Sequence, residues 1–245
     1  MATFEKLIRE MPIPSDWDKQ LFVIPGDYTE RNFYHALVYA KEHGTYLARG
    51  SSRAVFEITY EGRQTVLKMA MNQAGLAQNA EDIKVIFGAA TRKNQVVVPG
   101  IDYDTESSAP LWIHQEYAGP LDEIVFQNKY GFQISEMVAF AKAATGTGYD
   151  QPVLTPAELQ VEYPEVVAAT HSPALDLVML VHQMKVAGKK RTFLSDISGS
   201  HNWGICRGKY VIVDFGYSDE VAADFYSGHG PKEPRGSGGT SWHPR

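Results

Sequence analysis

A short stretch near the C-terminus of this 245-residue chain restricts its fold more than any other part of the sequence. Asp196 stands before a run of small polar residues, and Asn202 follows that run. A turn at 207–209 then leads into a β-branched segment at 210–213, which ends at Asp214. Because turn residues separate two apolar runs of strand length, this pattern predicts a β-hairpin. The hairpin would bring the two carboxylates and the amide together at strand ends.

These three side chains indicate a magnesium site at the mouth of a small sheet. Carboxylate and amide oxygens are ligands that Mg²⁺ prefers, and the ion takes its remaining ligands from phosphate and water. The alternative explanation is a hairpin with polar turns and no further role.

The order of these residues resembles the catalytic half of the protein-kinase-like fold, in which an Asp and an Asn precede a hairpin that ends in Asp-Phe-Gly. Here that tripeptide is 214–216. The resemblance implies that Asp196 is the catalytic aspartate and that Asn202 and Asp214 hold the metal. Two features depart from the family pattern. Asn202 follows Asp196 after six residues instead of five, and Leu194-Ser195 replaces the usual His-Arg.

Residues 46–70 are predicted to form three strands, at 46–48, 54–60 and 64–69. Lys68 closes the third strand, and 65–68 resembles the family's Val-Ala-Ile-Lys. By this resemblance, Lys68 reaches the α- and β-phosphates of ATP. The loop at 49–53 resembles a reduced glycine-rich loop, whose backbone N–H groups suit an anion. The resemblance assigns it three nucleotide-binding residues, namely Gly50, Ser51 and Ser52.

A lysine in this role needs an acidic partner on the next helix, which is predicted at 74–87. Glu81 is the preferred partner, and Asp82 is the second choice. A strand at 111–118 follows, and it ends at a Gly-Pro pair that suits a hinge. The resemblance implies that Glu116, Tyr117 and Ala118 bind the adenine base.

Helical spacing at 134–141 and at 174–184 predicts that the second half of the chain is mostly helical. The sequence contains no Ala-Pro-Glu after 214–216, so it resembles compact atypical kinases of bacteriophages. The predicted fold is therefore α+β and two-lobed, with a small antiparallel-sheet lobe and a reduced helical lobe. The predicted segments are a helical extension (1–45), an N-lobe (46–118), a C-lobe (119–226) and a disordered tail (227–245).

The composition narrows the possible environments and partners. Hydrophobic residues make up 44% of the chain and the net charge is −6, which allows a proper core and gives no dense basic surface for nucleic acid. The single cysteine cannot form an internal disulfide and fits a reducing compartment. No apolar run has membrane-spanning length. We expect a cytoplasmic protein, in the host cytoplasm if it is viral, with no membrane contact. The oligomeric state cannot be predicted from the sequence.

The function that the resemblance implies is transfer of the γ-phosphoryl group of ATP, with Mg²⁺, to a serine or threonine of a protein substrate. Two alternatives stay open on the same fold. One is phosphoryl or nucleotidyl transfer to a small molecule. The other is a pseudokinase or virion-associated protein that binds without catalysis, which the reduced glycine loop and the longer Asp–Asn spacing favour.

Overall fold

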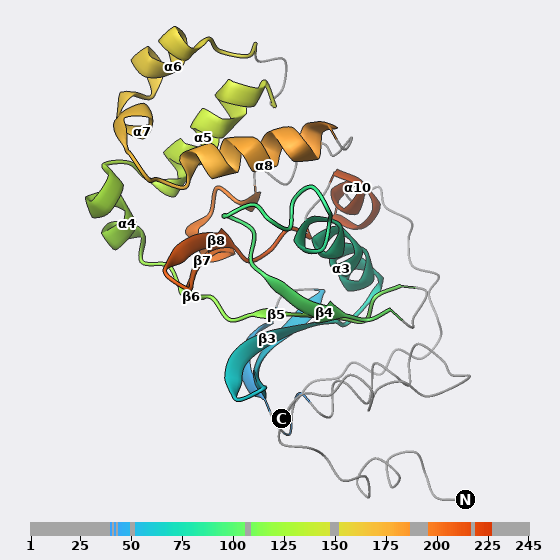
Figure 1. Ribbon diagram of the computed structural model, residues 1–245. Coiled ribbons are helices and arrows are strands. Elements are labelled where there is room, and N and C mark those ends of the chain that lie inside the picture. The colour runs from blue at the N-terminus through green and yellow to red at the C-terminus, as the bar shows by residue number, and fades with distance from the viewer. Residues whose placement is uncertain are drawn as a thin grey trace, which may run out of the picture.

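The computed structural model combines an antiparallel sheet with several helices, as predicted (Figure 1). The predicted tail and nearly all of the predicted N-terminal extension lie outside the residues that the structure describes. Those residues are 40, 42, 44–49, 52–105, 109–147, 152–186, 196–216 and 219–226. No helix within these ranges is long and apolar enough to cross a membrane.

Five antiparallel strands form the larger sheet, in the order β1-β2-β3-β5-β4. The strands are β1 (Thr45–Arg49), β2 (Arg53–Tyr60), β3 (Arg63–Ala70), β4 (Gly100–Tyr103) and β5 (Trp112–Glu116). A two-residue turn joins β2 to β3, and both of its residues, Glu61 and Gly62, have positive φ, which matches the twist of the paired strands. The predicted strands at 46–48, 54–60 and 64–69 are therefore confirmed, and the one predicted at 111–118 is confirmed over Trp112–Glu116.

Residues 96–103 divide into two parts that pair with different partners. Only β4 joins the large sheet, whereas Val97 forms a parallel bridge with Ile212. Pro99 stands between the two parts, and its missing N–H cannot continue a ladder. Residues 96–98 consequently link the large sheet to the hairpin near the C-terminus.

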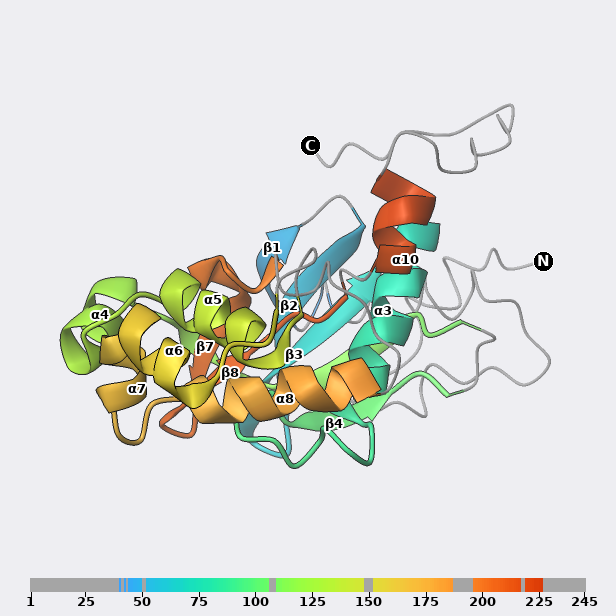
Figure 2. The same ribbon diagram turned by 90° about the horizontal axis from the view of Figure 1, so that it is seen from above.

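One helix, α3 (Gln73–Ile86), lies beside the large sheet in both ribbon views (Figures 1 and 2). The Asn72 side chain caps it by accepting a hydrogen bond from the Gly75 N–H at 3.0 Å. Its buried face is polar toward the N-terminus, with Gln78, Asn79 and Asp82, and becomes apolar at Val85. Polar residues buried on a helix need partners, which the site supplies.

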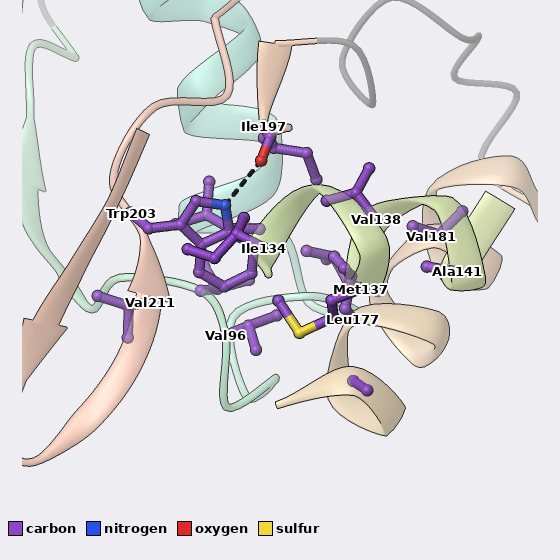
Figure 3. Close-up of a cluster of buried hydrophobic side chains, with 14 of the residues drawn as sticks. Val96, Ile134, Met137, Val138, Ala141, Leu177, Val181, Ile197, Trp203 and Val211 are labelled. Atoms are coloured by element: carbon purple, nitrogen blue, oxygen red, sulfur yellow. Dashed lines mark hydrogen bonds between the residues drawn. The ribbon is translucent and has the colours of Figure 1, made fainter. Parts of the chain in front are cut away.

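Helices make up most of the second half of the described chain. They are α4 (Glu123–Tyr130), α5 (Ile134–Thr145), α6 (Pro156–Glu162), α7 (Pro164–Ala168) and α8 (Ala174–Val186). α5 and α8 pack together and carry much of the larger hydrophobic cluster (Figure 3). The predicted helices at 134–141 and 174–184 are confirmed by these two elements. A second, smaller cluster belongs to the large sheet.

A three-stranded sheet stands between the large sheet and the helices (Figure 1). It contains β6 (Gly119–Pro120), β7 (Trp203–Cys206) and β8 (Lys209–Ile212). The β7–β8 hairpin is the one that the sequence predicts, with its turn at Arg207 and Gly208. The Trp203 indole N–H donates to the Ile197 carbonyl at 2.7 Å, so the loop before the hairpin is fixed to the core (Figure 3). After β8, α10 (Asp219–Val221) and a π-helical turn (Ala222–Tyr226) lie next to α3.

Candidate functional site

A cavity of about 680 Å³ opens between the large sheet and the β7–β8 hairpin. It is lined by residues of both parts, so side chains far apart in the sequence meet there. Of the predicted site residues, Ser52, Lys68, Ala118, Asp196, Asn202 and Asp214 line it. Gly50 and Ser51 lie outside the described residues.

Lys68 lies on β3, between Val55 of β2 and Ile113 of β5, and its side chain is almost completely buried. Its Nζ donates to Asp82 Oδ2 at 3.0 Å and also to the Val213 carbonyl oxygen. The ammonium group therefore reaches from the sheet to the residue that directly precedes Asp214. Lys68 thus lies on a predicted strand and lines the cavity.

The predicted partner of Lys68 was Glu81, and this prediction is wrong in the structure. Asp82 makes the ion pair, while Glu81 pairs with Lys84 on the same helix. One residue along a helix rotates a side chain by about 100°, and this rotation directs Asp82 inward. Asp82 has no exposed surface, and its Oδ1 also accepts the Phe215 N–H at 2.6 Å. The carboxylate thus connects α3 to β3 and to the tripeptide after β8.

Arg53, the first residue of β2, is a member of the site that the sequence analysis missed. Its Nη1 donates to Asp82 Oδ2 at 2.7 Å, and its Nη2 donates to Asp214 Oδ1 at 2.5 Å. Burial by itself lowers the pKa of Arg53, but the charges of Asp214 and Asp82 outweigh it and raise the pKa above its usual value. The signal in the sequence is the basic residue at the end of the polar loop 49–53.

Asp214 lies directly beyond β8 and retains about a third of its side-chain surface, 32%. Its Oδ1 also accepts the Gly216 N–H at 3.0 Å. Burial tends to raise its pKa, but the charges of Arg53 and Lys68 outweigh burial and hold the pKa well below its usual range. A Cβ at Gly216 would come within 2.9 Å of Arg53 Nη2, so glycine leaves room for the guanidinium.

Asp196 and Asn202 are brought together by two consecutive tight turns. The Gly199 N–H donates to the Asp196 carbonyl, and the Asn202 N–H donates to the Gly199 carbonyl. The Asn202 Nδ2 then donates to the Asp196 carbonyl at 2.9 Å, while the Val213 N–H donates to the Asn202 carbonyl at 2.9 Å. The second turn accommodates the additional residue between Asp196 and Asn202. Both side chains therefore reach the cavity in spite of the longer spacing.

Burial raises the pKa of the Asp196 carboxyl above its usual value, and the negative charge of Asp214 raises it further. A carboxylate of this kind binds a proton more readily than an exposed one. Asp214 and Asp196 thus differ in their environments, since a guanidinium neutralises the first and the second has a higher proton affinity.

Two of the three residues at 116–118, which are predicted to bind the adenine base, lie at the cavity. Tyr117 and Ala118 line it, but Glu116 does not. The Glu116 N–H donates to the Pro99 carbonyl at 2.9 Å, and its carboxylate accepts from the Arg207 guanidinium. The Glu116 side chain therefore holds the β7–β8 turn against β5.

Gln115 is a second lining residue that the sequence analysis missed. Only 2% of it is exposed, and its Nε2 donates to the Val213 carbonyl at 3.4 Å. Its Oε1 is buried and accepts no hydrogen bond from any described residue. A buried polar atom without a partner is costly, and it is commonly satisfied by a ligand or water. Nothing in the apolar run 111–113 signals this role in the sequence.

The residues at the cavity fit Mg²⁺ by the chemistry of their oxygens. Within the described ranges, no group of three or more His, Cys, Asp or Glu side chains forms a metal site by itself. Mg²⁺ does not require one, because it binds to one or two carboxylates and takes phosphate and water as its other ligands. Asp214 and the Asn202 amide, both on the cavity wall, supply such oxygens.

The chain matches no protein-family model and no curated protein sequence. Among solved structures, it is similar to a mutant of the PknI kinase domain of Mycobacterium tuberculosis, with 15% identity and a TM-score of 0.36. The match covers 74% of this chain and 60% of that domain. A similarity at this level does not establish family membership.

Proposed function

We propose that this chain is a compact phosphotransferase with a two-lobed protein-kinase-like fold. It binds ATP with Mg²⁺ in the cavity and transfers the γ-phosphoryl group to a serine or threonine hydroxyl of a protein. One observation carries this proposal. The buried Lys68–Asp82 pair stands beside Asp214 at the end of a hairpin, and Asp196 and Asn202 line the same cavity. Phosphoryl transfer depends mainly on positioning and on charge neutralisation, which is what such a set of residues provides.

In this proposal, each charged residue has its own task. Lys68 binds the α- and β-phosphates, and Asp82 holds the ammonium group in place, which replaces the role first expected of Glu81. Asp214 and Asn202 are the metal-binding residues. Mg²⁺, when bound, supplies positive charge that neutralises the β- and γ-phosphates.

Asp196 would orient the acceptor hydroxyl and accept its proton. A general base works best when its pKa approaches the pH at which the reaction runs. The raised pKa of Asp196 moves in that direction, whereas the lowered pKa of Asp214 keeps that carboxylate ionised for a cation. The two carboxylates therefore suit different steps.

The base would lie against Tyr117 and Ala118. Gln115 Oε1, which has no partner among the described residues, would accept a hydrogen bond from the exocyclic amine of adenine. Guanine presents a carbonyl oxygen at the corresponding position, which cannot donate to this acceptor. The proposal therefore includes a preference for ATP over GTP.

Labelled nucleotides test the proposed reaction directly. The protein is incubated with Mg²⁺ and either γ-labelled or α-labelled ATP, with mixed protein substrates from a lysate. Transfer of the γ label alone to protein supports the proposal. Asp196→Asn and Lys68→Met should remove the transfer, and Lys93→Met, a change at an exposed lysine, should not. Label transfer to small molecules, or from α-labelled ATP, would contradict it and favour a small-molecule phosphotransferase or a nucleotidyl transferase.

A second candidate function is nucleotide binding without catalysis. The Arg53–Asp214 ion pair favours it, because a guanidinium already occupies the Asp214 oxygen that a metal would use. In that case ATP would bind, and no label would be transferred under any of the conditions above.

A further inference from the structure

The guanidinium of Arg53 bridges two carboxylates that belong to different elements. Asp82 approaches from α3, and Asp214 approaches from the end of β8. Only about 7% of the Arg53 side chain is exposed, so solvent screens these interactions weakly. Arg53 is therefore a buried, ion-paired residue of the site and not a surface cation.

The charges in this group balance without any metal. Lys68 and Arg53 both donate to Asp82 Oδ2, and Arg53 also donates to Asp214 Oδ1. The group therefore contains two cations and two carboxylates. A divalent ion on Asp214 would add two positive charges a few ångströms from Arg53, in a region where charges interact more strongly than in water.

A polyphosphate changes this balance, because it brings several negative charges into the same cavity. Guanidinium groups bind phosphate oxygens with the same two-pronged geometry that they use for carboxylates. Arg53 could thus exchange Asp214 for a phosphate with little loss of hydrogen bonding. Asp214 would then be available to a metal that the phosphates themselves attract.

We infer that Arg53 is the resident counter-ion of Asp214 and competes with the divalent metal, so that metal binds tightly only when the phosphates of a nucleotide have entered. Arg53 is a positioning residue in this scheme. The inference rests on the proposed function, because it takes Asp214 as a metal-binding residue. It adds to the proposed function that the nucleotide phosphates bind before the metal, and it gives the arginine at the start of β2 a role.

The inference is tested by metal binding without turnover. Mn²⁺ binding to the full chain is measured by electron paramagnetic resonance, without nucleotide and then with sodium tripolyphosphate. Wild type should bind Mn²⁺ weakly alone and much more tightly with tripolyphosphate. Arg53→Gln removes the competing charge, so it should bind Mn²⁺ alone at least about tenfold more tightly than wild type. The double variant Arg53→Gln with Asp214→Asn should lose that gain.

Two further variants separate this role from a purely structural one. Arg53→Lys keeps the charge but lacks the fork that spans both carboxylates, so its Mn²⁺ affinity should lie between those of wild type and Arg53→Gln. It also carries the test if Arg53→Gln does not fold. Arg63→Gln removes an exposed arginine on β3 that pairs with Glu61 of the adjacent turn, and it should bind Mn²⁺ as wild type does.

Equal Mn²⁺ affinities in wild type and in folded Arg53 variants would overturn the inference. The proposed function could still hold in that case, because ATP binding and label transfer are measured separately. Conversely, if no label is transferred, the Mn²⁺ titration still tests the inference, because the titration requires no catalysis.

Discussion

Asp82 makes more of the connections within the site than any other side chain described above. It accepts hydrogen bonds from Lys68, from Arg53 and from the Phe215 N–H, and it has no exposed surface. Removing one partner of a buried ion pair is costly, because it leaves the remaining charges uncompensated. The adjacent residue, Glu81, is buried to 10% exposure of its side chain, but it pairs with Lys84, whose side chain is 56% exposed, so solvent screens this pair and its contribution to stability is smaller.

Asp82→Asn should therefore lower the free energy of unfolding by about 3–5 kcal/mol. Glu81→Gln, one position earlier on the same helix, should lower it by less than about 1 kcal/mol. Urea denaturation at neutral pH, followed by circular dichroism, measures both values. A greater loss from Glu81→Gln than from Asp82→Asn would mean that the register of α3 differs from the one described.

His114 provides a second residue-scale prediction, which concerns pH. The ring is fully buried on β5, its Nε2 lies 2.7 Å from Thr65 Oγ1, and it contacts the Tyr60 ring edge to face. Burial lowers the pKa of His114 from 6.5 to about 4, with partial opposition from Asp102. The unfolded chain therefore takes up a proton near pH 6.5, while the folded chain stays neutral until about pH 4. Its contribution to stability is present above pH 6.5 and is lost as the pH falls toward 4.

The measurement for His114 compares wild type with His114→Asn in urea between pH 7 and pH 4. The stability advantage of wild type over the variant should shrink by up to about 3 kcal/mol across this range. Other groups that titrate in acid affect both proteins alike, so the difference isolates the histidine. A constant difference would show that His114 becomes protonated in the folded state without cost.

At the residue scale, the sequence was sufficient to predict the cavity positions of Lys68, Asp196, Asn202 and Asp214. Asp196, Asn202 and Asp214 stand next to the ends of β7 and β8 or in the short loop before them, and spacing limits where they can go. Lys68 lies within β3, in the segment that resembles the family's Val-Ala-Ile-Lys. The choice between Glu81 and Asp82 was different, because two adjacent acidic residues on a helix give no signal of which faces inward. Arg53 was missed because its importance depends on two carboxylates, 29 and 161 positions away along the chain.

At the scale of elements, α3 is held against the sheet by a close approach at Gly75. A Cβ at this glycine would meet the Ser52 carbonyl oxygen and would come within 3.0 Å of the Ala70 Cα. Both are backbone atoms and cannot rotate away. The Ser52 carbonyl also accepts the Met71 N–H at 2.8 Å, so this contact fixes the chain immediately before Arg53.

Gly75→Ala should accordingly destabilise the protein by about 1–3 kcal/mol through overpacking. At an ordinary helical position the same substitution would stabilise the protein, since alanine is more favourable than glycine in a helix by about 1 kcal/mol. Gln73→Ala, at an exposed position in the same turn, serves as the control and should change stability little. Thermal unfolding of the three proteins gives the sign directly. Stabilisation by Gly75→Ala would contradict the close approach of helix and sheet.

Short elements were predicted where turn residues flank them, as in the β7–β8 hairpin, and the longer ones were predicted from their hydrophobic pattern. β2, β3, α5 and α8 show it over eight or more residues. The helices α6 and α7 contain seven and five residues, which are too few to show the hydrophobic periodicity of a helix. Their signals were local, namely a proline at the start of each and a reciprocal capping pair between Thr155 and Glu158.

At the scale of the whole molecule, the cavity depends on how two parts of the described chain are joined. The large sheet has its own small hydrophobic cluster, and the hairpin and helices share the larger one. Residues 96–98 run between them and pair with β8, while Lys68 and Gln115 both donate to the Val213 carbonyl beside it. No local pattern predicts this junction, because the residues whose side chains donate to Val213 are 98 and 145 positions away from it along the chain.

The central claim, that this cavity binds a magnesium nucleotide through Lys68 and Asp214, is tested most directly by calorimetric titration of Mg²⁺-ATP. Wild type should bind ATP with Mg²⁺ at millimolar concentrations or below, and binding should weaken when EDTA removes the metal. Asp214→Asn should lose this metal dependence, because it lacks the carboxylate that holds the ion. Lys68→Met should lose most of the binding, and Lys93→Met should keep it. Absence of binding by folded wild type at millimolar Mg²⁺-ATP, or undiminished binding by Lys68→Met, would contradict the account.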